Sequence, residues 1–488
     1  MSNAIPLTVA LTTFNRLSWL REAVAAILAQ TFQDFEFLIL DNHSTDGTAE
    51  YCLGLRDPRV RYIRQPPGQN AIFNSVTAQV AARGTRLILT HDDDIMEPEL
   101  LARQMHWMDA DPNLKLVWTR TAHIDEAGRF LNPPQTVPDL YFPPLEYLRH
   151  FLSDHLWPMP SGMMFERETV LHYIRAVIHR IHCGGKEIQT RKERKEAGAG
   201  DMSMPAIANL HHAIAVIGEP LLRERRHAQQ ETYAIDINGP MILLYEALYR
   251  LSRRRKDHAV NLPKCDFEAN RLRYVAQSAF TLETEPTLSP PRLKSLRDRW
   301  LRLHEAPDLS ATARFALLPL TLALLLHKGG VTPRVECVLA AQYHDLPASS
   351  APTPAARALK YWLEGFMTGG QNTQNTGLLA AFAGQRVMLF GSAFIAALLV
   401  LEARRAGAHI LGCLDSNSRR QQDGMMLGVP IHPPAWLATQ ADCVDVLILT
   451  PEKAHEPMLR DIAHRFAPRL KVVSWKELAD SAFGNSGI

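Results

Sequence analysis

The chain has 488 residues, of which 46% are hydrophobic and 21% are charged, and its formal net charge is +2. That length is too great for one hydrophobic core, and about three domains are expected from length alone. The balanced charge gives no reason to expect nucleic-acid binding. The six cysteines form no C-x-x-C pair, which favours reduced thiols in a cytoplasmic protein over a disulfide framework or a zinc site.

The first third of the chain alternates short apolar runs with helical segments. The strand-like runs are Leu7–Leu11, Phe35–Leu40, Val60–Ile63 and Leu87–Leu89, and Leu114–Trp118 is a further candidate. Ser44, Thr45 and Asp46 are turn and N-cap residues, which favour a helix start after the second run. This strand–helix order predicts a parallel sheet with helices on both faces.

Polar residues follow three of these runs: Thr12–Arg16, Asp41–Asp46 and His91–Asp94. The carboxyl ends of parallel strands meet at one edge of a sheet, so we expect these three segments to share a crevice. Adjacent carboxylates repel one another, and a hard divalent cation is their natural guest. The alternative is a solvated acidic turn closed by Pro98.

Each piece of this crevice suits part of a nucleoside diphosphate. Phe14 offers an aromatic face for a base, and Asp41 can accept an N–H from the base edge. Asp92 can hold ribose hydroxyls, and Asp93 can hold a cation that bridges two phosphates. The segment has no glycine-rich phosphate loop, which favours a user of nucleotide sugars over an ATPase or a dehydrogenase.

Over residues 5 to 235 the chain resembles the family 2 glycosyltransferases. The motifs that carry the resemblance, in chain order, are Thr12–Arg16, Gln30–Thr31, Asp41–Thr48, Asn74, Gly84, Asp92–Asp94 and Pro98. The resemblance implies a GT-A fold and inverting sugar transfer with Mn2+ or Mg2+ as cofactor. Two positions depart from the family pattern. His91 stands where many members have the first aspartate, which leaves the division of ribose and metal contacts between Asp92 and Asp94 open, and Gly200 precedes Asp201 where an acid is usual.

The resemblance also implies roles for individual residues. The donor nucleotide is expected to contact Thr12, Phe14, Asn15, Arg16, Asp41, Asn74 and Asp92. The metal is expected at Asp93, Asp94 and His227, with Asp93 the most direct ligand. Ser161–Phe165 matches the segment that lines the acceptor side, and Asp201 matches the general base. Asp201 as a helix N-cap and Arg223–His227 as a solvated basic face stay open as alternatives.

The middle of the chain, residues 239–370, has mainly helical patterns. Its most apolar stretch, Phe315–Leu326, is too short to span a bilayer and predicts a buried core helix, with a helix on the membrane surface as the alternative. The charge run Lys186–Lys195, which lies before it, predicts a solvated loop. A lid over an anionic donor, or a patch that faces anionic lipid, is the alternative.

The last part returns to an α/β pattern. Its strand-like runs are Arg386–Phe390, Ile410–Leu414, Val444–Thr450 and Lys471–Ser474. They predict a small doubly wound, Rossmann-like domain. Gly391 opens half of a dinucleotide-binding fingerprint and Asp415 suits a ribose, but the usual glycine triplet is absent. Ligand binding and a structural or docking role both remain open.

The sequence therefore predicts a GT-A domain over residues 1–238, a helical region over 239–370 and a Rossmann-like α/β domain over 380–488. The predicted activity is metal-dependent, inverting transfer from a nucleoside-diphosphate sugar, UDP-sugars being favoured, to a hydroxyl of a saccharide or glycolipid. The expected setting is surface polysaccharide or glycoconjugate synthesis in the cytoplasm, with peripheral contact at the inner membrane face left open. The alternative is a non-catalytic carbohydrate- or partner-binding scaffold that retains the fold.

Overall fold

The computed structural model describes residues 5–68, 71–153, 156, 158–168, 200–227, 238–253, 263–368, 377–416, 420–421, 424–452 and 456–483. The chain divides into two compact units. The first contains most of residues 1–227 and the second most of residues 228–488. The predicted charge run Lys186–Lys195 lies outside the described residues.

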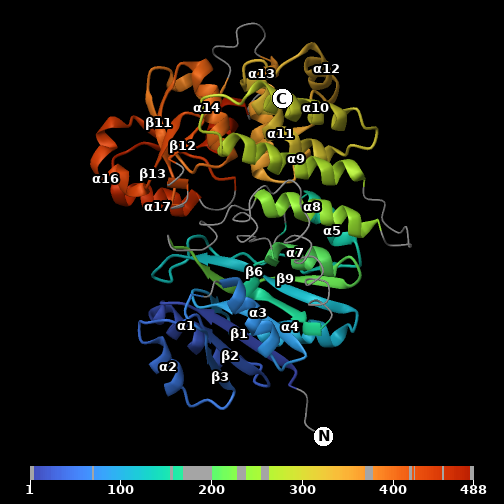
Figure 1. Cartoon of the computed structure of the whole chain (residues 1–488), viewed down its shortest axis with the longest axis vertical. Helices are drawn as coiled ribbons and strands as arrows, with labels where there is room; N and C mark the ends of the chain where they lie inside the picture. The colour runs from blue at the N-terminus through green and yellow to red at the C-terminus, as the bar shows by residue number, and fades with distance from the viewer. Residues whose placement is uncertain are drawn as a thin grey trace. The chain divides into compact units, whose positions relative to one another are not determined.

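The first unit is built on a mixed sheet in the order β3-β2-β1-β4-β8-β6-β9-β5, with β7 paired to β9 (Figure 1). Its strands are β1 (Leu7–Thr13), β2 (Glu36–Asp41), β3 (Val60–Arg64), β4 (Arg86–His91), β5 (Ile95–Met96), β6 (Leu114–Ile124), β7 (Leu140–Phe142), β8 (Met163–Glu166) and β9 (Ala213–Arg225). Strands β1 to β4 are parallel, as predicted from the strand–helix order. Beyond β4 the parallel expectation fails, because β8 runs antiparallel to both β4 and β6.

The helices of this unit are α1 (Leu17–Leu28), α2 (Thr48–Gly54), α3 (Ala71–Ala81), α4 (Leu100–Ala110), α5 (Glu146–Ser153), the 3-10 turn η1 (Pro160–Gly162) and α7 (Gly200–Ala208). One hydrophobic core joins β1 to α1 and α4, with Val9, Leu20 and Met105 among its buried members. The expected cap of α2 is corrected: its N-cap is Gly47, at φ 92°, and has no side-chain cap. Asp46 instead accepts a hydrogen bond from the Thr48 backbone N–H at 3.2 Å.

The second unit contains helices and a smaller sheet in the order β12-β13-β11-β10-β14-β15. Its strands are β10 (Arg386–Phe390), β11 (His409–Leu414), β12 (Met425–Met426), β13 (Val429–His432), β14 (Val446–Leu449) and β15 (Val472–Ser474). The four predicted runs all form strands, and β12 and β13 are additional. The five strands from β13 to β15 in this order are parallel to their neighbours, as in a doubly wound fold.

The longer helices of the second unit are α8 (Asn238–Ser252), α9 (Lys264–Thr281), α10 (Pro290–His304), α11 (Ala311–Leu326), α12 (Pro333–Gln342), α13 (Pro354–Thr368), α14 (Phe394–Ala406), α17 (Glu456–Phe466) and α18 (Trp475–Phe483). Helix α11 is buried along nearly its whole length, so the prediction of a core helix over Phe315–Leu326 is confirmed. One hydrophobic core joins α9 to α13 with α14 and the small sheet. Within the part of the chain that the structure describes, every helix is too short or too polar to cross a bilayer.

Candidate active site

The three polar segments that follow β1, β2 and β4 lie at one edge of the first sheet. Thr13 pairs with Asp41 across β1 and β2, and Thr12 pairs with His91 across β1 and β4. The convergence predicted from the sequence is therefore confirmed. Because these strands are parallel, the loops that follow them start side by side at the carboxyl edge of the sheet.

Asp92 connects the loop after β4 to the loop after β1. Its carboxylate accepts hydrogen bonds from the Thr13 hydroxyl at 2.7 Å, the Phe14 backbone N–H at 3.3 Å and the Arg16 guanidinium at 3.0 Å. Burial raises the pKa of Asp92 to about 6, although the charge of Arg16 opposes that rise. The predicted ribose contact thus belongs to a carboxylate that also fixes the loop carrying Phe14.

Asp93 is surrounded by positive or potentially positive groups. Its Oδ2 accepts from Arg16 at 2.8 Å and lies 2.9 Å from Nε2 of His227. Burial acts to raise the pKa of Asp93, but the His227 hydrogen bond and the charges of His91 and Arg16 outweigh it and hold the pKa below its usual range. Asp93 therefore keeps its negative charge inside the fold. The ring of His227 packs against Trp19, with 4.5 Å between centroids.

Asp94 is buried, as are Asp92 and Asp93. The Ser161 hydroxyl donates to its Oδ2, and the Arg225 backbone N–H donates to its Oδ1 at 3.3 Å. Burial raises the pKa of Asp94, and the charges of Asp93 and Glu224 raise it further. Ser161 stands in η1, so the predicted acceptor-side segment starts in contact with the aspartates.

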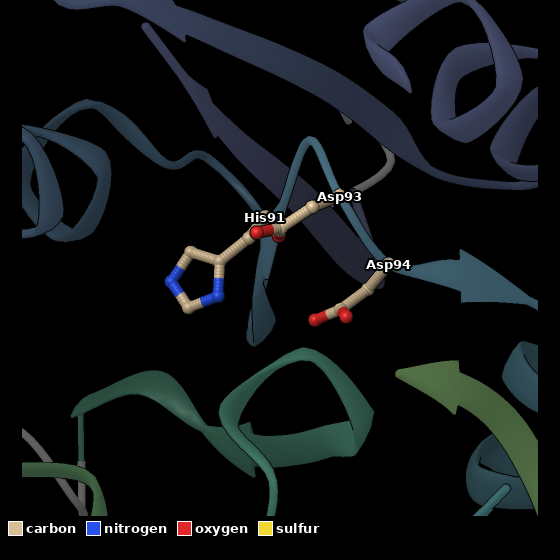
Figure 2. Close-up of side chains that lie close together, drawn as sticks. All are labelled: His91, Asp93 and Asp94. Carbon is tan, nitrogen blue, oxygen red and sulfur yellow. The ribbon is translucent and has the colours of Figure 1, made fainter. Parts of the chain in front are cut away.

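The side chains of His91, Asp93 and Asp94 lie together at the turn that follows β4 (Figure 2). One ligand atom from each lies within 4.8 Å of the others, which is close enough to share one ion. Two carboxylates and an imidazole suit a divalent metal of the first transition row, and Mn2+ fits this mixed oxygen and nitrogen set better than Mg2+. The sequence had indicated His91 only as a departure from the family pattern. His227, expected as a ligand, meets Asp93 through a hydrogen bond.

The nucleoside side of the site is formed by the loops after β1 and β2. Asp41 is fully buried and accepts from the Ser44 N–H at 2.8 Å and from the Tyr62 hydroxyl at 2.6 Å. Phe14 is 53% exposed, which is unusual for a large aromatic side chain and leaves its ring open to a planar ligand. Asn15, at φ 52°, ties the two loops together, since its side-chain oxygen accepts from the Thr45 N–H at 2.8 Å.

Three further predicted site residues are Thr12, Asn74 and Asp201. The first two contact backbone carbonyl groups, and the side chain of the third is not described. The Thr12 hydroxyl lies 3.5 Å from the carbonyl oxygen of Thr90, and the buried Asn74 donates to the carbonyl oxygen of Leu40 at 3.2 Å. Asp201 falls in the first turn of α7, and its side chain lies outside the described residues. Its role as base or cap stays a prediction.

Several residues that organise the site were missed in the sequence. Tyr62 and Ser44 bind Asp41, and Arg225 donates to the carbonyl oxygen of Asp93 at 3.3 Å and to Glu22 at 2.7 Å. Tyr62 belongs to a run with a plain strand pattern, so nothing in the sequence set it apart. Arg225 was visible only as one member of a basic cluster.

Fold and site together define an α/β domain with an acidic cluster at the carboxyl edge of its sheet. Residues 8–172 match the family model described as Glycosyl transferase family 2. This segment of the chain is therefore similar to glycosyltransferase family 2.

Curated relatives match within the same part. An uncharacterized glycosyltransferase, MJ1057 of Methanocaldococcus jannaschii, is 27% identical over 162 residues, which is 32% of this chain and 54% of that protein. Glycosyltransferase GlyG of Streptococcus pneumoniae is 31% identical over 110 residues, or 22% of this chain and 36% of that one. This chain thus covers about half of the first relative and less of the second.

Among solved structures, S. aureus TarS 1–349 in complex with UDP-GlcNAc is similar at a TM-score of 0.40 and 14% identity. That similarity covers 75% of this chain and 92% of that one. It is too weak to support a functional argument.

Proposed function

We propose that this protein is a metal-dependent, inverting glycosyltransferase. It transfers a sugar from a nucleoside-diphosphate sugar, with UDP-sugars favoured, to a hydroxyl group of a saccharide or glycolipid. The proposed setting is synthesis of a surface polysaccharide or glycoconjugate at the cytoplasmic side. The observation that carries the proposal is the joining of two loops at Asp92, which brings the exposed ring of Phe14 and the donor set around Asp93 to one sheet edge.

The nucleotide is proposed to lie across this edge with its base on Phe14. The Asp41 carboxylate accepts hydrogen bonds from the Ser44 N–H and the Tyr62 hydroxyl. In the proposed complex it also accepts an N–H of the base. Uracil and guanine both offer a ring N–H, whereas adenine and cytosine have none on the ring in their usual forms. A contact made to a ring N–H would therefore favour uracil and guanine over the other two bases.

His91, Asp93 and Asp94 are the residues proposed to hold the metal, which would supply positive charge for the leaving diphosphate. Arg16 and His227 contact Asp93 and place further donors close to the same point. These protein groups would orient the diphosphate and stabilise its growing charge in a partly dry site. Asp201 is proposed to take the proton from the attacking hydroxyl, which typically contributes about 100- to 10,000-fold in rate.

The test is donor binding and turnover in the full chain with and without Mn2+. Binding is measured by calorimetry with UDP and GDP, and turnover by release of UDP or GDP from a panel of nucleotide sugars. Asp93→Asn should lose the Mn2+ dependence of donor binding, whereas Asp201→Asn should bind the donor like wild type and lose turnover.

A protein that binds UDP or GDP tightly but releases none from any nucleotide sugar would support the alternative, a binding scaffold without catalysis. Absence of binding to every nucleoside diphosphate, with Mn2+ present, would refute the proposal as a whole. Equal loss of donor binding in the two variants would refute the separate roles given to Asp93 and Asp201.

A further inference from the structure

Arg120 is a partly buried arginine for which the described residues provide no acid and no acceptor. Its Nε atom is buried without a hydrogen-bond partner, and burial alone lowers the pKa of its guanidinium, with no carboxylate opposing that change. A cation in such a position costs free energy unless a counter-charge arrives. Arginine is also the side chain best shaped to grip a carboxylate or a phosphate with two parallel hydrogen bonds.

Two acids of the neighbouring strand β9 form ion pairs with other cations. Glu224 of β9 pairs with Arg226 at 3.0 Å, and Glu219 pairs with Arg103 at 3.4 Å. Both glutamates are therefore already paired with a cation other than Arg120. Among the described residues, neither of these acids forms an ion pair with the Arg120 guanidinium.

The pairing of β6 with β8 carries Arg120 towards η1, the turn that holds Ser161. Strands β6 and β8 are antiparallel, and their last pair is Trp118 with Met163, the first residue of β8. Arg120 follows Trp118 by two residues, and Ser161 precedes Met163 by two. A Cβ built on Gly162 would lie 3.0 Å from the Thr119 side chain, which agrees with this register.

The Ser161 hydroxyl in turn touches the acidic cluster. It donates to Asp94 and lies 3.4 Å from Nδ1 of His91. Arg120 also sits where the β6–β9 ladder is interrupted, since the register jumps from Thr119–Ile217 to Thr121–Leu222. Such irregularities re-aim side chains and are common beside active sites.

The strand order separates Arg120 from the nucleoside side of the site. Two steps across the sheet lead from β2, with Asp41, to β4, and two more lead through β8 to β6. Each step is roughly 5 Å, so Arg120 lies about 10 Å beyond β4, on the side away from Asp41. A ligand group that reaches it belongs to the part of the substrate beyond the diphosphate.

We propose that Arg120 is a specificity-determining residue that binds an acidic group, a carboxylate or a phosphate, on the transferred sugar or on the acceptor. This inference rests on the proposed function and adds a charge requirement to it. The same acidic group could belong to the transferred sugar or to the acceptor. An experiment with one arm for each distinguishes the two.

The experiment uses the full chain with Mn2+ and compares wild type with Arg120→Gln and Arg120→Lys. In the first arm, calorimetry measures the dissociation constants of UDP, UDP-glucose and UDP-glucuronate. In the second arm, the protein saturated with UDP is titrated with glycerol 3-phosphate and with glycerol. Arg465→Gln, which removes an exposed guanidinium from α17, is the control.

We expect the acidic probe of one arm to bind wild type more tightly than its neutral counterpart. Arg120→Gln should weaken that binding about 10- to 100-fold, as expected for loss of a charge-assisted hydrogen bond, with UDP itself unchanged. Arg120→Lys should restore part of the loss, and Arg465→Gln should behave like wild type.

Three results would overturn the inference. The first is equal binding of acidic and neutral probes by wild type in both arms. The second is an unchanged preference in Arg120→Gln. The third is loss of UDP affinity in Arg120→Gln, which would move the residue to the diphosphate or to the stability of the fold. A wild type that binds no UDP would refute the proposed function instead, and this inference with it.

Discussion

Removal of the Ser161 hydroxyl should weaken metal binding in a way that depends on pH. The hydroxyl donates to the buried carboxylate of Asp94, and this hydrogen bond lowers the pKa of Asp94 against the larger opposing effect of burial. In Ser161→Ala the pKa of Asp94 should rise further. A metal ligand must lose its proton before it can bind, so protons then compete more strongly with Mn2+.

The magnitude follows from the single interaction that is removed. A hydrogen bond to a charged group contributes about 1.5–3 kcal/mol, which corresponds to roughly one to two pKa units. We therefore expect Mn2+ to bind Ser161→Ala about 10- to 100-fold more weakly at neutral pH. The sign follows from the raised pKa: affinity for Mn2+ should increase as pH rises, and the curve of the variant should be displaced to higher pH.

The assay is titration of Mn2+ into the protein between pH 6 and 9, with free Mn2+ read by electron paramagnetic resonance. Ser44→Ala is the control, because Ser44 contacts Asp41 and Asn15 on the nucleoside side and should leave Mn2+ binding unchanged. Equal affinities for wild type and Ser161→Ala at every pH would refute the reasoning. A loss of affinity that is the same at every pH would show a structural effect of the substitution in place of the proton competition.

Three other substitutions test separate parts of the molecule. Phe14→Ala should weaken UDP binding about 10- to 100-fold, the usual contribution of base stacking on an aromatic ring, and unchanged calorimetric affinity would exclude the stacking role. Tyr62→Phe removes the 2.6 Å hydrogen bond to Asp41 and should reduce UDP affinity several-fold without altering Mn2+ binding, which the same titrations measure. Glu402, fully buried in α14, has its pKa raised from 4.5 to about 7 by burial, so the folded state holds its proton where the unfolded chain has lost it. Stability should therefore fall by up to ~3 kcal/mol as pH rises from about 4.5 to 7, and thermal unfolding should lose most of this dependence in Glu402→Gln. A variant with the pH dependence of wild type would contradict the assignment to Glu402.

The acidic end of β4 was predictable because its evidence is local. An apolar run followed by Asp92–Asp94 reads as a strand that ends in carboxylates, and the parallel order of the first strands brings the loops after β1 and β2 to the same edge. The same local reasoning correctly located β10, β11, β14 and β15 of the second sheet and the core helix α11, but not β12 and β13. These features depend on periodicity over a few residues, which the sequence carries by itself.

The hydrogen-bond partners of the three aspartates could not be predicted, because they come from distant parts of the chain. Ser161 reaches Asp94 across 67 residues, and His227 reaches Asp93 across 134. The position of His91 in the motif did not show whether its side chain could join Asp93 and Asp94 around a metal ion. The distances between their ligand atoms come only from the folded chain.

Arg120 illustrates the same point, since an arginine in a strand pattern is unremarkable until its surroundings are known. Sequence alone thus determined the strand ends and their chemical types. Only the tertiary structure decided their partners, because charge, burial and hydrogen bonding are set by neighbours that the linear order does not reveal.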